Sequence, residues 1–297
     1  MRPWVAFLGM GSVPEVQKWS RAGHQWDLAS DSLAVPFTSC GVGAETEYLI
    51  ADFRPFLWNG SIWTSHTIEL QGHPQRMALS TLDFASQALQ LELIFEKNLI
   101  GDISGLSGQE KNWGFFLSDD SLLIQYETLP CVHIFEYDPF IPRHAFERIK
   151  TCYRDTEHQL KALTLLDLEG RVHNSCNPIL WDKAGNGTNE YLVMVHNRYG
   201  QMTPGYNHWL VRMDAESFEL THISEGIVFG AALHHSEGHI PNVIIVGSIS
   251  LVKSGERLQL LVLGGEGDKY AIYERINMDA IAWVNLQAIN VKADAQQ

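Results

Sequence analysis

The sequence has little of several features that would point to particular classes of protein. Its four cysteines, Cys40, Cys131, Cys152 and Cys176, are widely spaced and form no C-x-x-C pair, which argues against a zinc site of the usual spacing. No run of 18 apolar residues occurs, so no membrane span is predicted. The first residues, MRPWVAFLGMGSV, lack the long apolar core and small-residue cleavage site of a secretory signal. We therefore expect a soluble protein with no metal and no membrane partner, in a compartment that the sequence does not define.

Basic residues are also few. The 297 residues include 21 Lys and Arg against 35 Asp and Glu, a net charge of -14. Such a surface repels the nucleic-acid backbone, and no local basic patch offsets it, so a nucleic-acid partner is not expected. The hydrophobic fraction of 45% and the charged fraction of 19% are those of a globular protein that buries a core.

Helical signals are scarce. DPFIPRHAFERIK (138–150) and VPEVQKWSRAG (13–23) are the two segments that could hold a short helix. The rest consists of short apolar runs, aromatic residues and turns that contain glycine, which indicates an all-β protein.

Four predicted hairpins recur along the chain. Their turns lie at Asn59-Gly60, at Ser118–Ser121, within Asp182–Glu190 and within Lys253–Glu256. Sheet units that repeat at about this spacing, roughly 60 to 70 residues, are typical of β-propeller blades. Four units and the strands of the two chain ends would fill five blades. We therefore predict one five-bladed β-propeller domain over residues 1–297, with a polar tail at 292–297.

Polar side chains gather where these predicted strands end, away from the turns. In a propeller, such positions beside the central channel can face a ligand instead of bulk water, and the placement repeats in all four units. The residues are Asp52, Arg54 and His66; Glu110, Lys111, Asn112 and Glu127; His173, Asn174, His196, Asn197 and Arg198; and Asp268 and Lys269.

Several of the same segments resemble a known family. EKNWGFF, followed by LLIQYETLPCVHIFEYD, resembles the part of five-bladed propeller glycosidase-type proteins in which a Lys-Asn-Trp triplet enters a strand. ADFRPFLWNGSIW is similar to the Asp-Pro-Arg strand of the β-mannoside phosphorylase family of glycoside hydrolases, with Phe53 where Pro is usual. HNSCNPILW resembles the next blade, although Ser175–Pro178 departs from the family's Thr-Pro motif. LQLLVLGGEGDKYAIYERI resembles the last blade. The resemblance spans roughly Ile50 to Met278, and residues 1–45 match the family's first blade poorly.

The resemblance implies a carbohydrate-active enzyme that acts on a glycosidic bond of an oligosaccharide or glycan, with a β-mannoside-like sugar as the leading substrate. It implies that Asp52 lies in the sugar pocket, either as the catalytic acid or as a ligand of sugar hydroxyls. Hydrolysis usually needs two carboxyl groups, and Glu127 is the second candidate. Phosphorolysis needs one acid and bound inorganic phosphate, which would be a co-substrate; no other cofactor is expected.

The remaining candidates would bind substrate. Arg54, Lys111, His196 and Arg198 could form a cationic side that holds oxyanions. Trp113, Tyr126 and Tyr206 offer flat faces for a sugar ring, but aromatic residues of this kind also pack in cores. The further candidates for sugar or phosphate contacts are His66, Asn112, Asn177, His173, His208 and Asp268.

Other interpretations stay open. A non-catalytic glycan-binding propeller would keep the fold without the chemistry, and a glycosyltransferase could use the same kind of pocket. Gly9-x-Gly11 after an apolar run imitates the start of a dinucleotide-binding domain, but Pro14 replaces the third glycine. HHSEGH (234–239) imitates a metal cluster, and His173 with Cys176 imitates a nucleophile and its base. The oligomeric state is not predicted.

Overall fold

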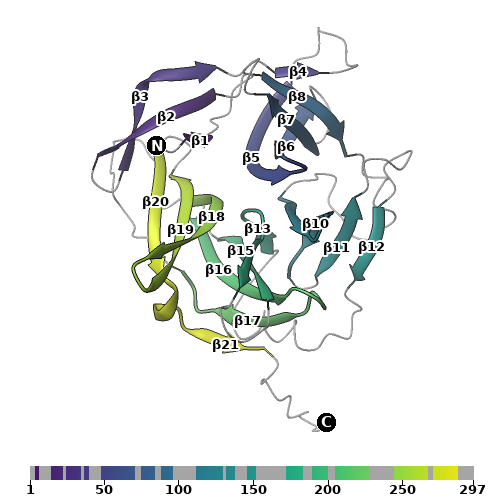
Figure 1. Cartoon of the computed structure of the whole chain (residues 1–297), viewed down its shortest axis with the longest axis vertical. Helices are drawn as coiled ribbons and strands as arrows, with labels where there is room; N and C mark the ends of the chain where they lie inside the picture. The colour runs from purple at the N-terminus through teal and green to yellow at the C-terminus, as the bar shows by residue number, and fades with distance from the viewer. Residues whose placement is uncertain are drawn as a thin grey trace.

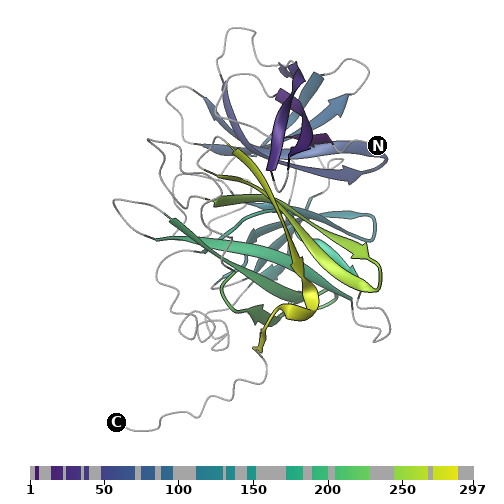
Figure 2. The same cartoon turned by 90° about the vertical axis from the view of Figure 1, so that its left-hand side faces the viewer.

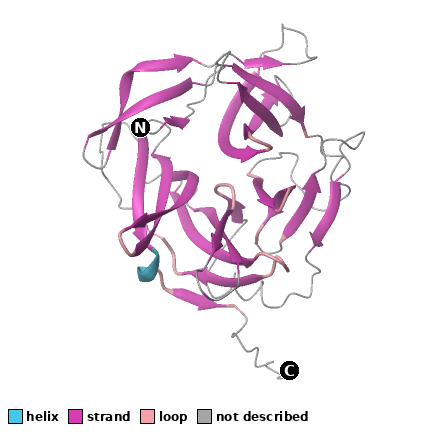
Figure 3. Ribbon diagram, viewed as in Figure 1, coloured by secondary structure: helices cyan, strands magenta, loops and turns pink. Residues whose placement is uncertain are grey.

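Strands make up almost all the regular secondary structure that a computed structural model of the chain describes (Figure 3). The helical element among the described residues is one 3₁₀ turn, η2 (Met278–Ala280). In this part of the chain no helix is long and apolar enough to cross a membrane. The all-β prediction is therefore confirmed. The structure describes residues 4–6, 15–22, 25–34, 37–39, 48–70, 75–83, 88–95, 112–129, 132–137, 146–151, 172–182, 189–199, 205–227, 244–266 and 270–286.

The described strands hydrogen-bond into four sheets, which are antiparallel except where β4 pairs with β8. The first sheet has the order β1 (Trp4–Ala6), β2 (Glu15–Ala22), β3 (Gln25–Ala34), β20 (Tyr270–Asn277), β19 (Arg257–Glu266), β18 (Ile244–Ser254). The second has the order β4 (Phe37–Ser39), β8 (Ala88–Ile94), β7 (Arg76–Asp83), β6 (Ser61–Leu70), β5 (Tyr48–Trp58). The third has the order β12 (Phe146–Thr151), β11 (His133–Tyr137), β10 (Ser121–Glu127), β9 (Gly114–Ser118). The fourth has the order β13 (Val172–Asn174), β15 (Asn189–Tyr199), β16 (Gly205–Asp214), β17 (Leu220–Ser224), β21 (Trp283–Asn285), and β14 (Ile179–Asp182) also pairs with β15.

The sheets stand around a common axis, as in a β-propeller, with β5, β9, β13 and β18 nearest the centre (Figure 1). Seen from the side, the long strands run between the two faces of this ring (Figure 2). The first sheet joins strands from the two ends of the chain, because β3 meets β20 at the pair Gln25 and Ile272 in the part of the chain that the structure describes. The number of five blades stays a prediction, as does the single domain.

The hydrophobic core lies between successive sheets. Residues of a strand point alternately to its two faces, and both faces of the inner sheets are covered. In β10, Leu122 and Ile124 pack toward the second sheet, whereas Leu123 packs toward the fourth. In β15, Val193 lies in the cluster shared with the third sheet, and Met194 lies in the cluster shared with β18 and β19. This packing of sheet face against sheet face around an axis is what a propeller requires.

The four predicted hairpins are confirmed. The β5–β6 turn has positive φ at both Asn59 (49°) and Gly60 (73°), the conformation that favours this dipeptide in tight hairpins. The β9–β10, β14–β15 and β18–β19 hairpins turn where the sequence predicts them. In the β5–β6, β9–β10 and β18–β19 hairpins the first strand is the innermost of its sheet; in the β14–β15 hairpin the first strand pairs with β15, as the innermost strand β13 also does.

The two segments that could hold a short helix contain strands where the structure describes them. Residues 15–22 form β2 and residues 146–151 form β12, an edge strand of the third sheet. Their helical spacing is overridden by pairing with β3 and β11. The dinucleotide-binding interpretation is wrong as well, because it needs a helix after Gly11, where residues 15–22 form the strand β2.

The outer part of the fourth sheet contains a buried ion pair. Arg212 donates from Nε and Nη2 to Glu190 Oε2 at 2.8 and 2.5 Å, and Thr221 donates to Glu190 Oε1 at 2.7 Å. The guanidinium lies against the rings of Trp181 and Trp283, at 5.1 and 5.3 Å from their centroids. Because Trp283 belongs to β21, this contact fastens the last described strand to the sheet.

Candidate functional site

A polar network joins three of the inner strands near the axis. Arg54 on β5 donates from Nη1 to Trp113 O (2.8 Å) and from Nη2 to Asn112 Oδ1 (3.0 Å) and Asn174 O (3.3 Å). Asn177 donates to Arg54 O at 3.3 Å and accepts a hydrogen bond from Phe115 N at 2.9 Å. Arg54 is 5% exposed, so its charge is held by oxygens of two neighbouring sheets and not by water.

Burial has an electrostatic cost for this side chain. Desolvation lowers the pKa of Arg54, and the nearby Asp52 carboxylate acts in the opposite direction. Among the described residues no carboxylate lies within ion-pair distance of the guanidinium. Its Nε and its second Nη1 hydrogen form no hydrogen bond with a described residue. An anionic group that reached Arg54 would therefore find unused hydrogen-bond donors on a buried cation.

Asp52 is displaced from the regular strand by a β-bulge. The β5–β6 register shifts between Ala51 and Arg54, so that Asp52 and Phe53 lie opposite the single residue His66. Asp52 has a φ of 57° and an exposed side chain, whose Oδ2 accepts a 3.4 Å hydrogen bond from Thr67. Bulges of this kind redirect side chains and are common beside active sites. Asp52 is thus a carboxylate that the fold turns toward solvent at the inner strand.

Asn112 has a comparable conformation just before β9. Its φ is 65°, and its side chain accepts the hydrogen bond from Arg54. Positive φ outside glycine is best tolerated by Asn and Asp, and it persists where the surrounding structure enforces it. The sequence analysis placed Asp52 and Asn112 in the polar sets of two different predicted units, and in the structure Asn112 bonds to Arg54 while the Asp52 carboxylate acts electrostatically on it.

Glu127 lies at the end of β10, beside a second irregularity of the sheet. The β10–β11 register shifts between Gln125 and Glu127, and Glu127 is paired with His133 on β11. Glu127 Oε2 lies 4.0 Å from His133 Nε2, and the side chains are 18% and 12% exposed, respectively. Both predicted carboxylates, Asp52 and Glu127, thus lie on the strand segments farthest from the hairpin turns of their sheets.

Three histidines form a ladder across the fourth sheet. His173 on β13 pairs with His196 on β15, which pairs with His208 on β16. Their ring centroids lie 5.8 and 6.0 Å apart, and the Tyr206 ring lies 5.2 Å from His196. Ser175 Oγ lies 2.9 Å from His196 Nδ1. Burial lowers the pKa of His208 to about 4, so this ring is neutral at pH 7.

The ladder and the Arg54 network adjoin through residues 173–177, because Asn174 accepts a hydrogen bond from Arg54. The structure therefore assembles eight predicted residues around one inner region: Asp52, Arg54, Asn112, Asn177, His173, His196, Tyr206 and His208.

Three other predicted residues are buried away from this region. Trp113 and Tyr126 are 1% and 6% exposed and pack in the aromatic core between the second and third sheets. His66 is fully buried, with Nε2 at 2.8 Å from Ser80 Oγ and its ring stacked on Phe53 at 4.9 Å. Burial lowers the pKa of His66 to about 4. These side chains offer almost no surface to a ligand.

Some predicted residues cannot be placed in the site. Lys111, Asp268 and the HHSEGH run (234–239) lie outside the described residues, and Arg198 is described only as part of the backbone of β15. Within the described residues no group of three His, Cys, Asp or Glu side chains could hold a metal ion. Cys176 is fully buried, and burial raises its pKa to about 12, so it cannot act as a thiolate nucleophile.

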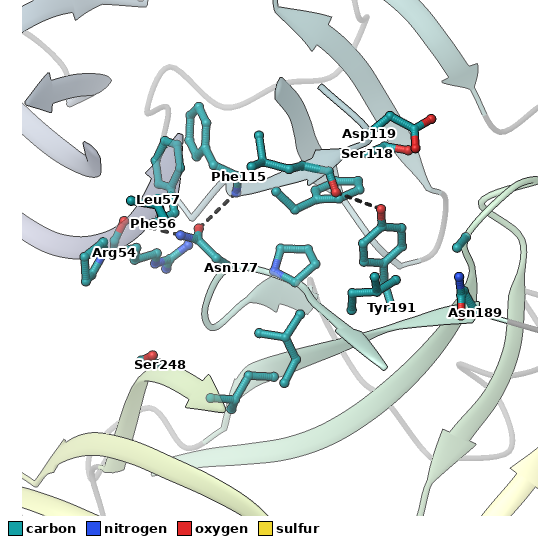
Figure 4. A pocket seen from close by; sticks show the side chains of 18 of the residues that line it. Arg54, Phe56, Leu57, Phe115, Ser118, Asp119, Asn177, Asn189, Tyr191 and Ser248 are labelled. Atoms are coloured by element: carbon teal, nitrogen blue, oxygen red, sulfur yellow. Dashed lines mark hydrogen bonds between the residues drawn. The ribbon is translucent and has the colours of Figure 1, made fainter. Parts of the chain in front are cut away.

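A cavity of about 1090 Å³ opens at the turn ends of the inner strands (Figure 4). Of the predicted residues, Arg54 and Asn177 line it, and they lie at one side of the view in Figure 4, away from Asp119. Tyr191, Asn189, Ser248 and Asp214 were missed by the sequence interpretation, because turn and strand residues of these types carry no motif. The lining residues are Arg54–Leu57, Phe115–Asp119, Asn177–Leu180, Asn189, Tyr191, Asp214–Glu216 and Gly247–Ile249.

Comparisons with known proteins give fold-level similarities alone. No protein-family model matches the chain, and no curated protein sequence matches it. The chain is similar to the solved structure of an exo-1,5-α-L-arabinanase from a bovine ruminal metagenomic library, with a TM-score of 0.44, 10% identity and coverage of 94% of this chain and 99% of that one. It is similar to a thermostable family-43 glycoside hydrolase, with a TM-score of 0.45, 11% identity and coverage of 91% and 87%. A third similar structure is an α-L-arabinanase of Cellvibrio cellulosa complexed with arabinohexaose, with a TM-score of 0.42, 11% identity and coverage of 91% and 92%.

Proposed function

We propose that the protein is a carbohydrate-active enzyme that acts on a glycosidic bond at the inner region formed by Asp52, the Arg54 network and the histidine ladder. The observation that carries the proposal is the conformation of Asp52. A bulge with positive φ exposes its carboxylate at an innermost strand, within electrostatic reach of a buried guanidinium. Cleavage of a glycosidic bond needs a carboxyl group that can give a proton to the leaving oxygen, and Asp52 is the group that we assign to this step.

The second requirement is a nucleophile for the anomeric carbon. In hydrolysis it would be water or a carboxylate, and Glu127 is the candidate for the second carboxyl group. In phosphorolysis inorganic phosphate attacks, and a cation must hold it. Arg54 supports this alternative, since its Nε and one Nη1 hydrogen lack a hydrogen-bond partner among the described residues. His173, His196 and Tyr206 would bind sugar hydroxyls, and a β-mannoside-like glycan is the substrate that we propose first.

A second candidate function is glycan binding without turnover. The hydrogen bonds from Arg54 to Asn112 Oδ1 and from Asn177 to Arg54 O favour it, because these groups are partly used to hold neighbouring sheets together. A site whose polar groups partly hold the sheets together could still bind sugar hydroxyls with its remaining groups. Such a site would bind a glycan without cleaving it if it lacked the second catalytic carboxylate.

Incubation of the full chain with manno-oligosaccharides of two to six units, with and without inorganic phosphate, tests these functions. Release of a sugar phosphate only when phosphate is present would support phosphorolysis, and shorter sugars in its absence would support hydrolysis. Saturable binding in calorimetry without any product would support the second candidate. The absence of both binding and turnover with manno-oligosaccharides and with a wider glycan panel would contradict the proposal.

A further inference from the structure

Ser175 is a polar residue of the inner region that the proposed function leaves without a role. It follows β13 and continues the pairing of this strand, because its backbone N donates to Met194 O at 2.8 Å. His173 lies directly opposite His196 in the β13–β15 register, and residues two apart on a strand point to the same face. Ser175 therefore lies on the same face as His196, one diagonal step from it.

The Ser175 hydroxyl is buried against the His196 ring. Its Oγ lies 2.9 Å from His196 Nδ1, and the two residues are 2% and 8% exposed, respectively. In the part of the chain that the structure describes, this hydroxyl has no other hydrogen-bond partner. Buried polar groups in native proteins are nearly always hydrogen-bonded, so His196 Nδ1 is the group that must satisfy Ser175.

The direction of this hydrogen bond follows from the same burial. A neutral imidazole has one nitrogen that donates and one that accepts, and a hydroxyl can do both. If His196 Nδ1 donated, the Ser175 hydrogen would be buried without an acceptor, which is the costly arrangement. If Ser175 donates, both its hydrogen and the Nδ1 lone pair are used. The ring proton of His196 then lies on Nε2, because the hydrogen bond at one ring nitrogen sets the state of the other.

The aromatic neighbours of His196 hold the ring itself. The Tyr206 ring lies 5.2 Å away at an interplanar angle of 76°, and the rings of His173 and His208 lie 5.8 and 6.0 Å away. Contacts of this kind depend on the faces and edges of the rings. They position the plane of the His196 ring, whereas the Ser175 hydroxyl distinguishes its two nitrogens.

We propose that Ser175 is a positioning residue: its hydroxyl donates to His196 Nδ1 and fixes the tautomer that carries the ring proton on Nε2. In this tautomer the ring is uncharged, so His196 acts as a donor to the oxygen beside Nε2 and does not join Arg54 as a second cation. The tautomer follows from the Ser175 contact alone, whereas the assignment of a sugar oxygen as the acceptor rests on the proposed function.

Nuclear magnetic resonance of the full chain, labelled with ¹⁵N at its 13 histidines, tests the tautomer directly. The His196 signals are those that disappear in His196→Gln. At neutral pH we expect Nδ1 of His196 to have the chemical shift of an unprotonated ring nitrogen and Nε2 that of a protonated one. The reverse pattern, or two protonated nitrogens, would overturn the proposal.

Three variants test whether Ser175 is the residue that fixes this tautomer. In Ser175→Ala the two His196 nitrogen shifts should move toward each other, because both tautomers then exchange, whereas Ser175→Thr keeps the hydroxyl and should keep the pattern. Ser80→Ala is the matched control, since Ser80 Oγ lies 2.8 Å from Nε2 of the buried His66. It should change the His66 signals and leave those of His196 as they are. Unchanged His196 shifts in Ser175→Ala would show that another group sets the tautomer and would refute the role of Ser175.

Calorimetry with manno-oligosaccharides tests the use of the fixed donor. Ser175→Ala should bind about five-fold more weakly than the wild-type protein, as expected for one weakened hydrogen bond, whereas Ser175→Thr and Ser80→Ala should bind normally. Equal affinity of Ser175→Ala and wild type would overturn the assignment of His196 as a donor to the sugar. If the wild-type protein binds no glycan, the proposed function fails, and the nitrogen shifts still decide whether Ser175 fixes the tautomer.

Discussion

Replacement of Arg54 by Met tests whether its guanidinium joins the inner strands. The substitution keeps the volume and the unbranched chain but removes donors to Trp113 O, Asn112 Oδ1 and Asn174 O. Each hydrogen bond to a charged group contributes about 1.5–3 kcal/mol, and buried acceptors left without a donor add to the cost. Part of this loss in stability is offset, because the variant no longer buries a cation whose pKa is lowered by desolvation. We expect a net loss of about 3 kcal/mol.

The measurement is a denaturant titration, with the variant and the wild-type protein at equal concentration. A loss in stability should appear as a lower midpoint with an unchanged slope. At about 2.1 cal/mol/K of unfolding entropy per residue, a loss of about 3 kcal/mol would lower the melting temperature of a chain of 297 residues by about 5 °C. Arg257→Met, at an exposed turn, is the control and should change stability by less than about 0.5 kcal/mol. A loss below about 1 kcal/mol in Arg54→Met would refute the role of Arg54 as a link between the sheets.

Three further predictions concern stability. Glu190→Gln should cost about 3–5 kcal/mol in a denaturant titration, because it leaves Arg212 buried without a counter-ion. Gly114→Ala should cost about 1–3 kcal/mol, since its new Cβ would lie 2.8 Å from Pro178 Cδ where two sheets meet. Burial lowers the pKa of His208 to about 4, so the unfolded chain binds this proton more tightly than the folded chain does. The contribution of His208 to the free energy of unfolding should therefore be constant above about pH 6.5 and fall as the pH drops from there to pH 4. In His208→Gln the measured stability should fall less steeply over the same pH range.

Much of the fold can be predicted from the sequence because hairpins are local. Asn59-Gly60 sets positive φ at two successive positions, and the apolar runs on either side fix the pairing. The two helix candidates failed in the described residues because β2 and β12 are defined by pairing with neighbouring strands and not by their own pattern.

The site could be predicted only in part. Asp52, Arg54 and Asn112 were chosen because polar residues gather at strand ends, and the structure does connect them. His66 was chosen on the same ground, and Trp113 was chosen for the flat face that it could offer to a sugar ring, but both side chains are buried. In a propeller both faces of a sheet are covered, so the alternation of polar and apolar residues no longer separates ligand-facing positions from core positions.

The turn-end cavity could not have been predicted from the sequence. Asp119 and Glu216 appear there as ordinary solvated turn residues, and Leu57 and Leu180 appear as core residues of their strands. Only the arrangement of several sheets around one axis brings these positions together.

The most direct test of the central claim is the turnover of manno-oligosaccharides by Asp52→Asn, with Asp120→Asn at the exposed β9–β10 turn as the matched control. Asn tolerates the positive φ of residue 52, so the melting temperature should change little. The account predicts that product formation is lost in Asp52→Asn and retained in Asp120→Asn. Undiminished turnover in a folded Asp52→Asn protein would contradict it.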